Sequence, residues 1–190
     1  MTKGQKLFTG ASRGAWGYFF LYLNVNFGTI NMLPNFVGWM LFLSAIGHLE
    51  EERRDLALLR PLAQMLAVWN FIDWLFTCLG VSLNGMLPVV ELVMSLAGLY
   101  FHFQFITDCA ALAADYQREG EELDRRLLRW RTWQTLLLTA TTLMIYPAEW
   151  FGGWWEIVTV GMVVVSAVAA LCLMMAMFAL RRLFGAQDTL

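Results

Sequence analysis

The sequence predicts an all-α membrane protein, a polytopic bundle of six transmembrane helices arranged as three hairpins. Of its 190 residues, 59% are hydrophobic and only 15% are charged, whereas soluble domains carry about 25% charged residues. Long apolar runs recur along the chain, and the Lys and Arg residues lie between alternate runs. The composition excludes a water-soluble enzyme, and the net charge of -2 excludes a basic nucleic-acid-binding protein.

Six apolar runs are candidates for helices that cross a bilayer, which takes roughly 20 apolar residues, or about 17 in a short span. Strands are disfavoured, because membrane barrels show segments of about 10 alternating residues and these runs are apolar on every side. The expected helices cover residues 14–32, 34–49, 61–81, 86–112, 130–148 and 154–180. They form hairpins over 14–49, 61–112 and 130–180 in a single integral membrane domain over 1–190. The first hairpin has an alternative, a re-entrant pair, because its second run is short.

The basic residues predict the orientation of these helices. With six crossings, every Lys and Arg falls on one side of the membrane, and the positive-inside rule makes that side the cytoplasm. Both termini and the charged linkers 50–60 and 115–131 are therefore expected in the cytoplasm of a bacterial cell, with the chain as a multi-pass inner-membrane protein. The four groups are Lys3, Lys6 and Arg13; Arg53, Arg54 and Arg60; Arg118, Arg125, Arg126, Arg129 and Arg131; and Arg181 and Arg182.

Two polar stripes lie inside expected helices. Asp73 lies 12 residues after Pro61, about 18 Å along a helix, and an ionisable group at that depth usually faces a cavity or a partner. Asn70, Asp73 and Thr77 share one face of that helix by their spacing. The next helix carries a second stripe with the spacing i, i+4, i+7, i+11, made of Glu91, Ser95, Gly98 and His102. A short connection makes these two helices neighbours, so the stripes can face each other.

Asp73, Glu91 and His102 therefore predict a polar path for a cation, a proton or a positively charged solute. The alternative is a hydrogen-bonded cluster that only holds the helices together. Asp108 is displaced from the stripe and close to the linker arginines, so an interfacial ion pair is expected there. Glu149 and Glu156 lie in a Trp-rich outer loop and are expected to be solvated.

A second polar cluster surrounds the first expected outer turn. It contains Asn24, Asn26, Asn31 and Asn35, with Gly28 and Pro34 among them. Gly and Pro favour a broken helix, whose free backbone groups can bind ions or polar solutes. The alternative is a polar corner in which an Asn caps the second helix.

The segment Asn26-Phe27-Gly28-Thr29-Ile30-Asn31-Met32-Leu33-Pro34-Asn35-Phe36-Val37-Gly38 resembles the N-x-G-x-I-x-x-L-P-x-F-x-G segment of a family of uncharacterised small polytopic bacterial membrane proteins. That resemblance covers about the first 50 residues and implies no activity. Six helices in a chain of this length are also similar in architecture to the substrate-binding components of energy-coupling-factor importers. The first expected helix departs from them, since it has bulky aromatic residues where they present an Ala-x-x-x-Ala surface.

The sequence thus favours transport or binding of a small solute or cation, with membrane lipids around the protein and a membrane protein or a second copy as potential partners. A non-catalytic scaffold or partner subunit is the second hypothesis. An intramembrane enzyme is the third hypothesis. It is placed last because the chain has no HExxH, GxSxG, P-loop or dinucleotide motif. No metal or other cofactor is expected.

Overall fold

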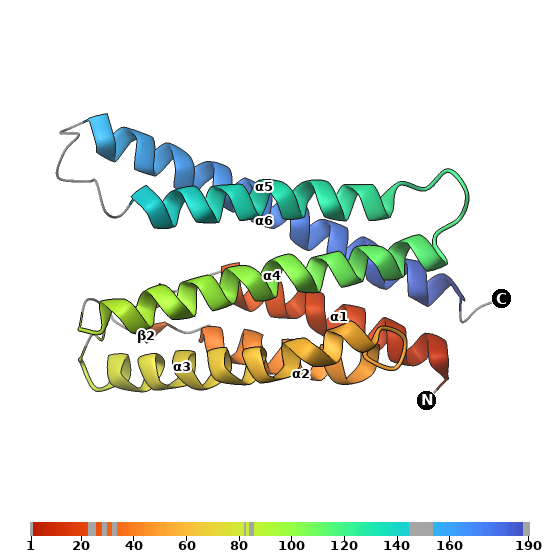
Figure 1. The fold of residues 1–190 in the computed structure, drawn as a ribbon, viewed down its shortest axis with the longest axis horizontal. Helices are drawn as coiled ribbons and strands as arrows, with labels where there is room; N and C mark the ends of the chain where they lie inside the picture. The colour runs from red at the N-terminus through yellow and green to blue at the C-terminus, as the bar shows by residue number, and fades with distance from the viewer. Residues whose placement is uncertain are drawn as a thin grey trace.

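A computed structural model describes residues 2–22, 26–27, 30–31, 34–81, 83, 86–144 and 154–187. In these residues the fold is a helical bundle (Figure 1). The α-helices are α1 (Lys3–Tyr22), α2 (Asn35–Leu49), α3 (Arg60–Cys78), α4 (Pro88–Tyr116), α5 (Leu123–Met144) and α6 (Trp154–Gln187). A 3-10 helix, η1 (Arg54–Leu59), precedes α3. Between α1 and α2, strand β1 (Asn26–Phe27) pairs antiparallel with β2 (Ile30–Asn31).

Successive helices run in opposite directions, so the chain forms an up-and-down bundle. Both termini lie at one end of it, together with the α2–α3 and α4–α5 connections (Figure 1). We call this the charged end and define it as residues 2–13, 48–60, 115–131 and 181–182. The connections α1–α2 and α3–α4 lie at the opposite end, which we call the far end. The all-α bundle predicted from the sequence is therefore confirmed.

Ion pairs and hydrogen bonds join the helices at the charged end. Lys3 Nζ lies 2.9 Å from a Glu52 carboxylate oxygen, and the Tyr116 hydroxyl donates to the same oxygen over 3.0 Å. The bond from Lys3 holds the pKa of the Glu52 carboxyl below its usual range. Lys6 pairs with Glu51 at 2.7 Å. These contacts connect α1, the α2–α3 connection and the end of α4.

The helices pack in a ring. Each helix contacts its neighbours in sequence, and α6 closes the ring by packing along α1. The pair α3 and α4 is the exception, because these two helices touch far less than the other neighbouring pairs. The ring therefore has one weak seam, between α3 and α4.

Small residues bring α1 and α2 close together. A Cβ atom added at Gly38 would lie 2.9 Å from the Gly17 carbonyl oxygen, and one added at Gly17 would lie 3.1 Å from the Phe42 ring. At Gly10 an added Cβ would lie 2.6 Å from the Leu49 side chain. Small residues permit such close approach of helix backbones, and the gain is dense packing.

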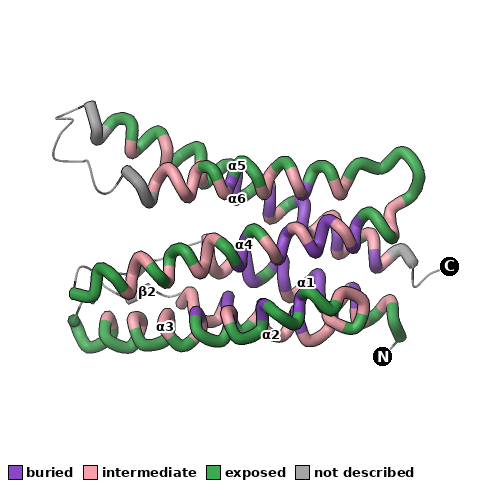
Figure 2. Tube along the Cα trace, viewed as in Figure 1, coloured by how far each residue is buried: buried purple, intermediate pink, exposed green. Residues whose placement is uncertain are grey.

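A layer of aromatic rings fills the middle of the bundle on this tight side. The Phe42 ring centroid lies 4.8 Å from that of Tyr18, 5.2 Å from that of Phe101 and 5.1 Å from that of Phe105. All four side chains are buried. Buried residues gather at this level and toward the charged end, whereas α3 and the far-end part of α4 are largely exposed (Figure 2). The bundle is thus tight toward the charged end and loose toward the far end.

In the described part of the chain, two helical segments are long and apolar enough to cross a membrane. They are Pro88–Tyr116, with a mean hydropathy of 1.5, and Ile157–Gly185, with 2.6. The helix α2 is apolar but shorter. By length and composition alone, the structure supports a membrane location through these segments.

The helix bounds differ from the predicted ones mainly in the first hairpin. The prediction of one helix over 14–32 is wrong, because α1 begins at Lys3 and ends at Tyr22, and the β1–β2 pair follows. The early turns are helical because Leu7, Gly10 and Ala11 pack inside the bundle, although charged residues interrupt the apolar run there. Two other helices are also longer at the charged end than predicted, since α5 begins at Leu123 rather than at 130 and α6 extends to Gln187 rather than to 180. The predicted start and end of the second helix agree with α2.

The close approach of α1 and α2 predicts that Gly38→Ala destabilises the protein. The added methyl group meets the Gly17 carbonyl oxygen, and overpacking of this kind costs about 1–3 kcal/mol. Gly161→Ala on α6 is the matched control, because its added Cβ meets nothing within 4 Å. Unfolding of the purified protein in detergent measures both, and equal stability of the two variants would contradict the tight α1–α2 contact.

Candidate functional site

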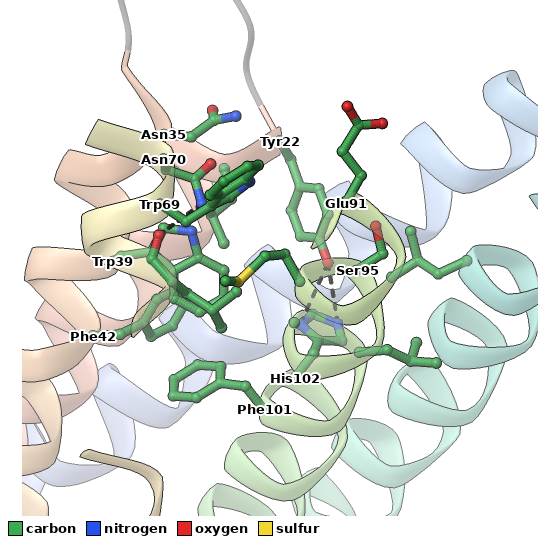
Figure 3. A pocket seen from close by; sticks show the side chains of 16 residues that line it. Tyr22, Asn35, Trp39, Phe42, Trp69, Asn70, Glu91, Ser95, Phe101 and His102 are labelled. Atoms are coloured by element: carbon green, nitrogen blue, oxygen red, sulfur yellow. Dashed lines mark hydrogen bonds between the residues drawn. The ribbon is translucent and has the colours of Figure 1, made fainter. Parts of the chain in front are cut away.

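A cavity of about 520 Å³ lies beside the weak seam, on the far-end side of the aromatic layer. We call it the central cavity. Residues of α1, α2, α3 and α4 line it, with Leu138 from α5 (Figure 3). Its polar lining consists of Asn35, Asn70, Glu91, Ser95 and His102, and its aromatic lining of Tyr22, Trp39, Phe42, Trp69 and Phe101.

The predicted stripe on α4 forms one wall of the central cavity. Glu91, Ser95, Gly98 and His102 all line it. Gly98 contributes space, because a Cβ added there would meet nothing within 4 Å. In Figure 3 the Glu91 carboxylate lies farthest toward the far end and His102 lies deepest. The structure thus places the whole stripe along one path from the far end to the aromatic layer.

The predicted stripe on α3 is divided between two hollows. Asn70 lines the central cavity, whereas Asp73 and Thr77 line a pocket of about 60 Å³ beside it. Asn35 and Asn70 line both, so the two hollows adjoin. Asp73 lines the smaller pocket, and Glu91 lines the central cavity. The acids of the two stripes therefore lie in adjoining hollows.

Hydrogen bonds within α3 satisfy part of its stripe. Asn70 Nδ2 donates to the Leu66 carbonyl oxygen over 2.8 Å, and the Thr77 hydroxyl donates to the Asp73 carbonyl oxygen over 2.9 Å. Both bonds stay within the helix, so neither joins α3 to α4. The Asn35 Oδ1 atom is buried without a hydrogen-bond partner among the described residues. Asn35 lines both hollows, and a buried polar atom of this kind usually finds a partner.

His102 lies at the floor of the central cavity and joins α4 to α1. Its Nε2 atom lies 3.0 Å from the Tyr22 hydroxyl (Figure 3), and the Tyr18 ring packs edge-on at 4.9 Å. The Gln134 side chain from α5 also hydrogen-bonds to the Tyr22 hydroxyl. Because only 5% of its surface is exposed, His102 contributes to the packing of the bundle and also lines the cavity.

The asparagine cluster is only partly described. Asn24 lies outside the described residues, and Asn26 and Asn31 face each other as partners in the β1–β2 pair. The break in the helix expected at this segment is confirmed, since α1 ends before it and α2 begins after it. The N-cap of α2 is Pro34, so the alternative in which an Asn caps this helix is wrong.

The remaining acids differ from expectation where they are described. Asp108 is buried and accepts hydrogen bonds from Gln104 Nε2 at 3.1 and 3.2 Å. It takes part in no ion pair with a described residue, so the predicted pair with a linker arginine is wrong. The amide reaches it because Gln104 lies one turn earlier on the same helix. Glu149 lies outside the described residues, and Glu156 lies in α6.

The sequence interpretation missed the aromatic lining. Trp39 and Trp69 lie within α2 and α3 rather than at helix ends, where tryptophans anchor helices at membrane interfaces. Their position within the helices could have indicated that these side chains face the interior of the bundle. In the same way, Gln134 is a single amide in the interior of α5, and this could have indicated that it hydrogen-bonds to another helix.

No protein-family profile, curated protein or solved structure matches this chain. Among the residues that the structure describes, no group of three or more His, Cys, Asp or Glu side chains could hold a metal ion. The site is therefore interpreted from its own chemistry. Aromatic faces attract cations, and a carboxylate beside them strengthens that preference.

The bond between Tyr22 and His102 predicts that Tyr22→Phe destabilises the bundle. Removing the hydroxyl leaves a buried imidazole nitrogen without its partner, which costs about 1–3 kcal/mol. Tyr100→Phe is the control, because Tyr100 lies on the same helix as His102 and is 60% exposed. Thermal unfolding in detergent compares the two variants. If both unfold at the same temperature as the wild type, the interhelical bond has no structural role.

Proposed function

We propose that the chain is a multi-pass inner-membrane protein with six crossings and cytoplasmic termini. The outward faces of its helices support this. Val68, Phe71 and Leu75 on α3 are exposed, although the polar stripe on the opposite face lowers the mean hydropathy of that helix. Exposed apolar side chains continue around the bundle on α4 and α6, among them Val89, Val93, Leu96, Val160, Val164, Val168 and Leu171. Apolar surfaces of this extent are unusual on soluble monomers.

The distribution of charge supports the proposed orientation. The Lys and Arg residues lie at the charged end, where both termini and the two charged connections also lie (Figure 1). In a membrane protein the end rich in basic residues faces the cytoplasm. The central cavity would then lie on the side of the aromatic layer that faces away from the cytoplasm.

Within this framework we propose that the central cavity binds a small cationic solute for transport. The observation that supports this most is the combination of aromatic walls and the Glu91 carboxylate in one cavity of about 520 Å³. Such a cavity is within the usual range for small-molecule sites. Trp39 and Trp69 supply faces for a cation, while Asn35, Asn70 and Ser95 supply hydrogen-bonding groups.

The pair Asp73 and Glu91 supports a link to protons or cations. These two carboxylates line adjoining hollows. Neighbouring carboxylates repel each other, and this repulsion falls when one binds a proton or when a cation lies between them. A cationic solute that enters near Glu91 relieves this repulsion. Its binding would therefore be coupled to the charge of the pair.

The proposed orientation predicts opposite labelling of the two ends of the bundle. After the three native cysteines are replaced by Ala, Met86→Cys introduces a thiol at the far end and Glu119→Cys introduces one at the charged end. Both positions are exposed. In intact cells an impermeant maleimide should label only Met86→Cys, and after permeabilisation it should label both. Labelling of Glu119→Cys alone in intact cells would overturn the orientation.

The proposed function predicts loss of cation uptake when the acids of the seam are neutralised. Proteoliposomes containing the full chain are assayed with radiolabelled choline, a small quaternary ammonium probe, under an imposed proton gradient. Asp73→Asn and Glu91→Gln should each lower the uptake rate by about tenfold, which corresponds to about 1.4 kcal/mol. Glu119→Gln, an exposed acid at the charged end, should leave uptake unchanged.

Unchanged uptake in both Asp73→Asn and Glu91→Gln would contradict the roles proposed for these residues. Absence of choline uptake by the wild type, together with a protein that copurifies stably with it, would favour the scaffold or partner-subunit hypothesis instead.

A further inference from the structure

A second cavity, of about 210 Å³, lies on the other side of Tyr22 from the central cavity. Tyr22 and Leu138 line both, so their side chains form the partition between the two. The other walls come from Gln134 on α5 and from residues 166–174 of α6. This second cavity has no part in the function proposed above.

Two polar atoms in this apolar cavity lack a partner. Gln134 Oε1 and Ser166 Oγ are buried, and neither has a hydrogen-bond partner among the described residues. Gln134 is only 1% exposed, and its amide already hydrogen-bonds to the Tyr22 hydroxyl. Since that bond uses the amide as a donor, the Oε1 atom remains as an acceptor. Leaving such a buried group unsatisfied costs about 1–3 kcal/mol.

The walls favour an apolar occupant over water. Apart from the two unpartnered atoms and Tyr22, the cavity is lined by Leu138, Ala167, Ala170, Leu171 and Met174. A buried water needs two to four polar partners, so water molecules that filled this cavity would lack most of them. An apolar cavity of about 150 Å³ holds one benzene ring. The second cavity therefore has room for one substituted ring.

We propose that the second cavity is a binding site for a small apolar molecule that carries one hydroxyl group, with phenol as the simplest example. The hydroxyl of the ligand donates to Gln134 Oε1 and accepts from Ser166, while its ring contacts the apolar walls. Leu171 is a wall residue with 47% of its surface exposed. The ligand thus enters from the apolar surroundings of α6.

Fluorine NMR titration of the full chain in detergent micelles tests the proposal, with protein-free micelles as the reference for partitioning. The probes are 4-fluorophenol and fluorobenzene, which differ in the hydroxyl group. The wild type should bind 4-fluorophenol at least about fivefold more tightly than fluorobenzene, because each hydrogen bond of its hydroxyl group contributes about 1 kcal/mol. Gln134→Met removes the acceptor and should lower this preference, because only the bond from Ser166 is left, while fluorobenzene binding remains.

Two further variants locate the site. Ala170→Leu fills the second cavity and leaves Gln134 and Ser166 unchanged, so it should abolish binding of both probes. Gly98→Leu fills the central cavity and should leave both affinities unchanged, which separates this test from that of the proposed function. Equal affinity of the wild type for the two probes, no binding of either, or binding that survives Ala170→Leu would overturn the proposal. Loss of binding in Gly98→Leu would also overturn it, because the probe would then occupy the central cavity.

Discussion

The close contact between α1 and α2 at Gly17 and Gly38 is the constraint on which the rest of the bundle depends. Because no side chains separate the two backbones there, Phe42 on α2 reaches the rings of Tyr18, Phe101 and Phe105. The aromatic layer then holds α4 against α1 and α2. Toward the far end the corresponding contact between α3 and α4 is sparse, so the same ring of helices opens into the central cavity.

This asymmetry determines where polar groups can lie. Polar residues on the exposed faces of the helices would lie against lipid if the chain spans a membrane, and the α3 and α4 stripes instead face the seam and its hollows. Tyr22 is central to this arrangement, since its hydroxyl bonds to His102 and to Gln134. One side chain thus forms the boundary between a cavity with a carboxylate in its wall and a cavity with almost apolar walls.

Some of this could be predicted from the sequence. The spacing of Glu91, Ser95, Gly98 and His102 places them on one face of any helix. Helix geometry alone therefore predicted that these four residues line the same wall. The bounds of α2 followed from a clear apolar run. The start of α1 did not, because its inward residues are small and lie among charged ones, so they lower the local hydropathy without preventing burial.

The aromatic lining was not predictable in the same way. Whether Trp39 and Trp69 face lipid or a cavity depends on how far α3 stands from α4, and that distance is a property of tertiary packing. Likewise, the second cavity depends on Tyr22, Gln134 and Ser166, which come from three helices. No local pattern relates them. The sequence indicated the polar residues of the site, and packing determined the shape of the space between them.

An experimental structure of the full chain in lipid, with and without the Gly98→Leu substitution, tests most directly whether the central cavity is a binding site. We expect ordered non-protein density of a small polar or cationic molecule between Trp69 and Ser95 in the wild type, and its absence in Gly98→Leu. Gly161→Leu should retain the density, because that glycine also faces open space but lies on α6. A central cavity that is closed by its own side chains, or occupied by lipid chains alone, would show that it is not a site for a cationic solute.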